Sequence, residues 1–234
     1  MDASGYAFVQ GVRATRATLS AWNRRPWSVL RTWFIGSLAA ASALLVAVWA
    51  IAELSEGVGV AFARPPLVVG GWSDVLRILY HNSLVLALHA MACIAGFIAG
   101  SSLPLQAERH TGITRIIHER GGRIAIVFVV AATTFSLSAQ AYVLGTTTAH
   151  VAFGLHCTPA LLLAGLLPHA VPELVALFLP LAAWIIASRR GEWDQLLAAT
   201  LVTVVIALPV LFLTALWEVF VAPHVLQGLI RYSH

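Results

Sequence analysis

Apolar residues occur in this chain as long runs separated by short polar stretches. Four of the runs are long enough to cross a membrane as helices, because one span requires about 20 apolar residues. They cover residues 33–53, 83–103, 124–144 and 196–217. The pattern predicts an all-α fold, namely a polytopic transmembrane helical bundle in a lipid bilayer.

The stretch from 145 to 189 is also apolar, but four prolines interrupt it. A break around 167–173 leaves close to one span length on each side, which favours two passes and six membrane segments in all. A single broken or tilted pass and a half-helix hairpin are alternatives, because irregular backbone is tolerated at membrane depth where protein buries it. We therefore predict about five to six membrane segments, with a broken helix around 167–173.

The first 32 residues interleave arginines with apolar side chains. They contain five arginines and one acid, Asp2, and no small-residue cleavage site follows the first apolar run. We expect an N-terminal interfacial amphipathic helix within 1–32 and a single transmembrane domain over 33–234. A disordered basic tail is the alternative. A further short interfacial helix is predicted from Ser73 to Leu79, with Ser73 as its N-cap.

Composition agrees with a membrane protein and narrows the choice of partners. The 234 residues are 59% hydrophobic and 10% charged, whereas soluble domains are about 25% charged. All the basic residues are arginines, mostly beside apolar runs, which is typical of headgroup anchors and not of a nucleic-acid surface. The positive-inside rule places the N-terminus and the 104–123 loop in the cytoplasm of a cell-membrane protein, with the 54–82 loop outside. The expected partners are the lipid bilayer and a second copy or another membrane protein.

Polar side chains within the predicted spans carry the candidate chemistry, because an ionisable group in a membrane is costly unless protein or a cavity surrounds it. Asn82, His89 and Cys93 lie on one helical stripe with Gly96 and Gly100. The two glycines permit close helix contact. The stripe therefore indicates either a packing seam or the lining of a polar cavity.

The strongest cluster is Pro168-His169-Ala170-Val171-Pro172-Glu173. Pro172 suits the first turn of a helix and Glu173 the positive end of its dipole, so a well-capped helix start explains the motif. The motif also places an imidazole within reach of a carboxylate, a pairing suited to proton transfer or metal binding. Glu218 ends the last apolar run without a neighbouring cation in sequence. It therefore needs a proton or a partner such as Arg77, Arg231 or a histidine.

The other polar residues are weaker candidates. Gln140 shares a helical face with two hydroxyl residues, which interhelical hydrogen bonds explain, and His150 and His156 lie on opposed faces without metal-ligand spacing. We therefore expect no metal and no cofactor. The candidate substrate contacts are His81, Cys93, Gln140, His156 and His224.

Four short motifs occur in the order found in one membrane family. They are Asn82 at the start of a span, Leu144-Gly145, Leu-Leu-Pro-His-Ala-Val-Pro-Glu-Leu over 166–174, and Ala-x-x-Glu-x-Phe-x-x-Pro over 215–223. Over about 75–225 the chain resembles the stage II sporulation protein M family, whose signature is Pro-His-Gly-x-x-Glu-[Leu/Ile]; Ala170 replaces the glycine here. The resemblance implies a multi-spanning protein that acts with peptidoglycan-remodelling partners, or beside the transporters and maturation proteins of peptide natural-product systems.

Two classes of function fit these residues. The first is a membrane component of a peptide maturation, peptide export or cell-envelope system, acting through a polar intramembrane cavity. The second is a cofactor-independent intramembrane enzyme that modifies a hydrophobic peptide, by epimerisation through proton abstraction at the α-carbon or by hydrolysis. Its candidate catalytic residues are His169, Glu173, His89, Asn82 and Glu218. Serine-hydrolase, nucleotide-binding and zinc-protease motifs are missing from the sequence.

Overall fold

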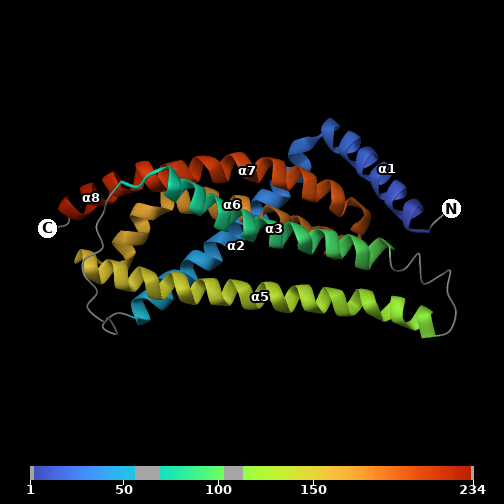
Figure 1. The fold of residues 1–234 in the computed structure, drawn as a ribbon, viewed down its shortest axis with the longest axis horizontal. Helices are drawn as coiled ribbons and strands as arrows, with labels where there is room; N and C mark the ends of the chain where they lie inside the picture. Colours follow the sequence, from blue (N-terminus) through green and yellow to red (C-terminus); the bar gives the residue numbers. More distant parts are fainter. Residues whose placement is uncertain (1–2, 56–68, 103–112, 233–234) are drawn as a thin grey trace. The chain divides into compact units, whose positions relative to one another are not determined.

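The computed structural model describes residues 3–55, 69–102 and 113–232, and in these ranges it confirms the all-α fold, with no strand (Figure 1). The α-helices are α1 (Ala3–Arg24), α2 (Pro26–Leu54), α3 (Trp72–Phe97), α5 (Ile113–Leu155), α6 (Pro159–Arg190), α7 (Leu196–Phe220) and α8 (Ala222–Tyr232). A π-helical segment, η1 (Ile98–Ser102), continues α3, and a 3₁₀ turn, η2 (Trp193–Gln195), precedes α7.

Within the described ranges, five helices are long and apolar enough to cross a membrane: α2, α3, α5, α6 and α7. The predicted spans 33–53, 124–144 and 196–217 fall in α2, α5 and α7. The predicted span 83–103 begins in α3 and continues through η1 to Ser102, and residue 103 lies outside the described residues. Each of these helices extends beyond its apolar run, because polar residues at a span end can continue a helix into the headgroup region. The chain is thus a multi-pass membrane protein with five spans in its described part.

The predicted break around 167–173 is wrong, because α6 is one continuous helix of 32 residues. A proline in a helix lacks the N–H that would bond the carbonyl four residues earlier, but neighbouring helices can supply donors to the loosened turn. Such donors are present near Pro180, where His89 Nδ1–H donates to Leu177 O at 2.9 Å and Cys93 Sγ donates to Pro180 O at 3.1 Å. The turn around Pro180 thus has donors from α3 inside α6.

The interruption lies earlier, at 156–158, between α5 and α6. The described part of the chain therefore has five spans, and the two passes favoured for 145–189 are replaced by the single span α6. Cys157 N–H donates to Ala152 O at 3.0 Å and His156 N–H to Phe153 O at 3.1 Å. These are the paired bonds of a Schellman motif, which places His156 in the left-handed region at a φ of 56°. Thr158 Oγ1 then accepts Leu161 N–H at 3.2 Å as the N-cap of α6, and Pro159 occupies its first position.

Two other predicted boundaries also differ from the structure. α3 begins at Trp72 and runs through 73–79 without a break, so the predicted interfacial helix is the first part of a span and Ser73 is not its N-cap. Asp74 Oδ2 instead accepts Gly71 N–H at 3.0 Å at this helix start. α5 begins at Ile113, so the last part of the predicted 104–123 loop is helical. The first part of that loop lies outside the described residues.

The chain divides into two compact units, each assembled from three segments. Unit 1 takes its described residues from 1–37, 85–133 and 177–207, and unit 2 from 38–84, 134–176 and 208–234.

Unit 1 is centred on Trp33 of α2. Its indole packs with Leu179 of α6 and Ala199 of α7, and Trp22 of α1 meets it edge-on at a ring-centroid distance of 5.2 Å. The predicted small-residue contact is present on α3, because a Cβ added to Gly96 would lie 2.6 Å from Trp184 Nε1. A Cβ on Gly100 would overlap the ring of Trp193.

Unit 2 contains two apolar clusters. Val75 of α3 packs with Ala215 and Val219 of α7. Leu226 of α8 packs with Leu162 of α6 in the second cluster. The first cluster fixes α3 against α7 at the level where the polar residues described next are found.

Candidate intramembrane acid site

Three helices of unit 2 bring polar side chains together. Glu173 on α6 and Glu218 on α7 are half-buried, and their carboxylates interact electrostatically. Asn82 of α3 and Thr214 of α7 lie beside the Glu173 carboxylate. Thr214 and Glu218 are four residues apart and therefore share one face of α7. We call Asn82, Glu173, Thr214 and Glu218 the acid cluster; it joins three of the five predicted catalytic candidates.

A charged pair at the start of α3 connects the acid cluster to the exposed part of unit 2. An Arg77 guanidinium nitrogen lies 2.9 Å from Asp74 Oδ1, and the two side chains are 68% and 38% exposed. Arg77 also interacts electrostatically with Glu218. Of the partners considered for Glu218 from the sequence, Arg77 is the one whose charge acts on its carboxylate. Charged groups therefore continue from an exposed pair through Glu218 to Glu173.

Buried polar atoms at the acid cluster lack hydrogen bonds. Asn82 Nδ2 and Glu173 Oε2 have no partner among the described residues, so the adjacent amide and carboxylate do not form a bond of ordinary geometry. His169 Nδ1 is also buried without a partner, and this residue precedes Glu173 by one helical turn on the same face of α6. An unsatisfied buried polar group costs about 1–3 kcal/mol. Three such atoms in unit 2 are available to a proton or a polar ligand.

His89 and Cys93 belong to unit 1, where other contacts occupy them. His89 is 1% exposed, and its ring centroid lies 5.5 Å from that of Phe178. Because Leu177 O can only accept, the His89 proton resides on Nδ1. Of the two interpretations of the α3 stripe, the packing seam accounts for both residues, which bond the α6 backbone around Pro180.

The candidate substrate contacts other than Cys93 have local contacts. His81 Nδ1–H donates to Arg77 O at 2.8 Å, His224 Nδ1–H donates to Phe220 O at 3.1 Å, and Gln140 Nε2 donates to Ser136 Oγ at 3.1 Å. His156 ends α5 in its Schellman motif. Among the described residues, no three His, Cys, Asp or Glu side chains are grouped closely enough to hold a metal ion.

Sequence reasoning missed Thr214, although its position one turn before Glu218 was a usable signal. Arg77 was named only as one of several partners for Glu218. Asp74, which completes the exposed end of the charged series, was not singled out at all.

Comparison with protein-family models, with curated proteins and with solved structures finds no match. The family resemblance therefore rests on its motif residues. Three of these motif residues, Asn82, Glu173 and Glu218, belong to the acid cluster. The fold and site define a multi-pass helical membrane protein with paired carboxylates inside its spans.

Proposed function

We propose that this chain is a membrane component of a peptide maturation, peptide export or cell-envelope system, and that its acid cluster takes up and releases a proton in that role. The observation that carries the proposal is the interaction of two carboxylates from different spans, Glu173 on α6 and Glu218 on α7. The order of motifs resembling the stage II sporulation protein M family supports the choice of system.

Electrostatics explains why such a pair suits a proton. Two carboxylates in a low-dielectric interior repel when both are ionised, and one shared proton removes that repulsion. The Asn82 amide can donate to a carboxylate or accept from a carboxylic acid. The Thr214 hydroxyl donates its own proton to Leu211 O at 3.1 Å and can accept from a carboxylic acid. Arg77 offsets the charge on Glu218. A state with one proton on the pair therefore leaves little uncompensated charge at the buried end of the cluster.

Proton occupancy can change the spacing of helices within unit 2. Loss of the shared proton makes Glu173 and Glu218 repel and favours separation of α6 from α7 at this level; proton uptake favours their approach. The Arg77–Asp74 pair gives protons an entry towards the half-buried Glu218 and Glu173, because the Arg77 side chain is 68% exposed and that of Asp74 38%. Such a two-state contact would couple protonation to work on a partner or peptide.

Cells carrying chosen alleles of the gene test this function. Secreted peptides and cell-wall composition are measured by mass spectrometry in a deletion strain and in strains with Glu173→Gln or Glu192→Gln. Glu192 is the matched control, because it is a half-buried carboxylate that follows α6 and precedes η2, outside the acid cluster. We expect the deletion and Glu173→Gln to cause the same change and Glu192→Gln to cause none. A deletion that alters neither peptides nor cell wall would refute the proposal.

A second candidate function is peptide epimerisation, which the unpaired His169 Nδ1 and Glu173 Oε2 on one face of α6 favour. In this reaction the bond between the peptide α-carbon and its hydrogen breaks, and His169 takes the proton. A protonated carboxyl on the opposite side of the α-carbon then returns a proton to the carbanion. The purified protein is incubated in deuterated water with the peptides encoded beside its gene. Deuterium should enter α-carbons with the native chain and with His224→Ala, but not with His169→Ala. Intact peptides without deuterium would exclude this reaction.

A further inference from the structure

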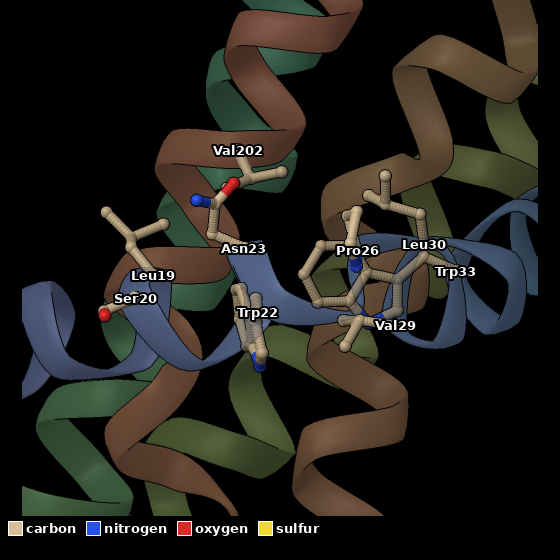
Figure 2. Close-up of a pocket in the computed structure, with 9 residues that line it drawn as sticks. All are labelled: Leu19, Ser20, Trp22, Asn23, Pro26, Val29, Leu30, Trp33 and Val202. Atoms are coloured by element: carbon tan, nitrogen blue, oxygen red, sulfur yellow. The ribbon is translucent and has the colours of Figure 1, made fainter.

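Unit 1 contains a cavity that the acid cluster does not use. Its volume is about 570 Å³, which is the size of a small-molecule site. The lining residues come from α1, the start of α2 and, through Val202, α7 (Figure 2). They are Leu19, Ser20, Trp22, Asn23, Pro26, Val29, Leu30, Trp33 and Val202. Only Ser20 and Asn23 are polar, so the cavity suits an apolar occupant.

The apolar wall is held by well-packed aromatic residues. Trp33 is 5% exposed and packs with Leu179 and Ala199, while Trp22 meets it edge-on. Two aromatic rings in this arrangement form a stable contact beyond their buried area. The cavity is thus bounded on one side by the core of unit 1.

Four arginines lie in and near the turn between α1 and α2, where both helices line the cavity. Arg24 and Arg25 lie between the lining residues Asn23 and Pro26, and Arg16 and Arg31 are exposed on α1 and α2. The sequence has no acidic residue from position 3 to position 52. None of these four arginines forms an ion pair with the part of the chain that the structure describes. These four guanidinium groups are therefore not engaged in ion pairs within the described residues, although η2, which contains Asp194, contacts α1.

We infer that this cavity binds an acyl chain of an anionic phospholipid, with the lipid phosphate at Arg24 and Arg25. An apolar cavity takes the hydrocarbon, and guanidinium groups bind phosphate through charge-assisted hydrogen bonds. Arginine clusters next to a span attract anionic lipids in general. A second copy of the chain fits less well, because it would bring the same arginines to the contact and the two sets would repel.

Photo-crosslinking identifies the occupant. The full-length protein is reconstituted in phosphatidylcholine nanodiscs with phosphatidylglycerol that carries a photoreactive group on its acyl chain, and crosslinked peptides are mapped by mass spectrometry. We expect crosslinks at the lining residues Leu19 and Leu30, competed by unlabelled phosphatidylglycerol and not by phosphatidylcholine. Equal competition by the two lipids, or labelling spread evenly over the spans, would assign the signal to bulk lipid and overturn the inference.

Two pairs of variants distinguish recognition of the lipid headgroup from binding of the acyl chain in the cavity. Arg24→Gln should weaken the preference for phosphatidylglycerol about fivefold, the effect of one basic residue near a membrane surface. Arg231→Gln is its control, because Arg231 is also exposed in the last turn of a helix and should change nothing. Val202→Trp should fill the cavity and abolish the crosslinks, whereas Val205→Trp, on an exposed position of α7, should keep them.

The opposite pattern contradicts the assignment. If Arg24→Gln and Arg231→Gln have equal effects, the arginines act only through total charge. If a Leu30→Cys variant forms a disulfide-linked dimer that excludes the lipid probe, the cavity belongs to a second copy of the chain.

Discussion

Replacement of His89 by alanine should destabilise the packing of α3 on α6. The side chain is 1% exposed, donates to Leu177 O at 2.9 Å and contacts the Phe178 ring. Loss of the bond costs about 0.6 kcal/mol if the carbonyl finds another partner in the membrane, and about 1–3 kcal/mol if it does not. The space left by the ring adds about 1–2 kcal/mol. The expected total loss in the free energy of unfolding is about 2–5 kcal/mol.

His81→Ala is the matched control on the same helix. His81 also donates from Nδ1 to a backbone carbonyl, at 2.8 Å, but the residue is exposed. Exposed substitutions usually change stability by less than about 0.5 kcal/mol. Unfolding is followed by circular dichroism in mixed micelles with increasing sodium dodecyl sulfate. His89→Ala should unfold at a clearly lower detergent fraction than His81→Ala or the native chain.

The prediction separates a structural His89 from a catalytic one. If His89→Ala leaves the unfolding transition in place but removes the function of the chain, His89 acts on a substrate or proton and the packing explanation is wrong. If both histidine variants are equally destabilised, burial of His89 by α6 is not the cause.

Three further predictions concern helix contacts and the single loop thiol. Gly145→Ala should lower the free energy of unfolding by about 1–3 kcal/mol, because the new Cβ would lie 2.6 Å from the Ile51 side chain. Gly228→Ala, whose Cβ meets no atom, should raise it by about 1 kcal/mol, and chemical unfolding measures both. His156→Gly should stabilise by about 1 kcal/mol without loss of function, since glycine adopts the left-handed φ of 56° at little cost; a loss of function would restore His156 as a substrate contact. Burial raises the pKa of the Cys157 thiol, so its labelling by maleimide should be slower at neutral pH than that of a small thiol in solution and should accelerate as pH rises. Equal labelling rates of Cys157 and the small thiol at neutral pH would contradict this.

The spans were predictable because hydrophobic runs of this length leave few other structures in a membrane. The position of the boundary in the proline-rich region was not, because Pro168 and Pro172 also match the pattern of a helix break and start, as Thr158-Pro159 does. The latter pair carries the ordinary signs of a helix start, an N-cap threonine and a proline at the first position. His156 in a left-handed conformation was hidden because glycine or asparagine usually occupies that site.

The candidate site was partly predictable from the energetic cost of ionisable groups in spans. That cost singled out Asn82, Glu173 and Glu218, and the structure brings them together. The same reasoning selected His89, which bonds the α6 backbone in unit 1 and does not belong to the acid cluster. A sequence gives the cost of a buried polar group but not its partner, because the partner depends on which helices pack together. Arg77 as the cation that acts on Glu218 is such a case.

Infrared spectroscopy of the protein in lipid bilayers tests the central claim, a proton shared by Glu173 and Glu218, most directly. We predict a carbonyl stretching band from a buried protonated carboxyl in the native chain at neutral pH. Glu173→Gln should remove the band, because Glu218 then remains with Arg77 alone. Glu218→Gln should shift it, and Glu192→Gln should leave it unchanged. A native spectrum without this band, or a band that survives Glu173→Gln unaltered, would contradict the account.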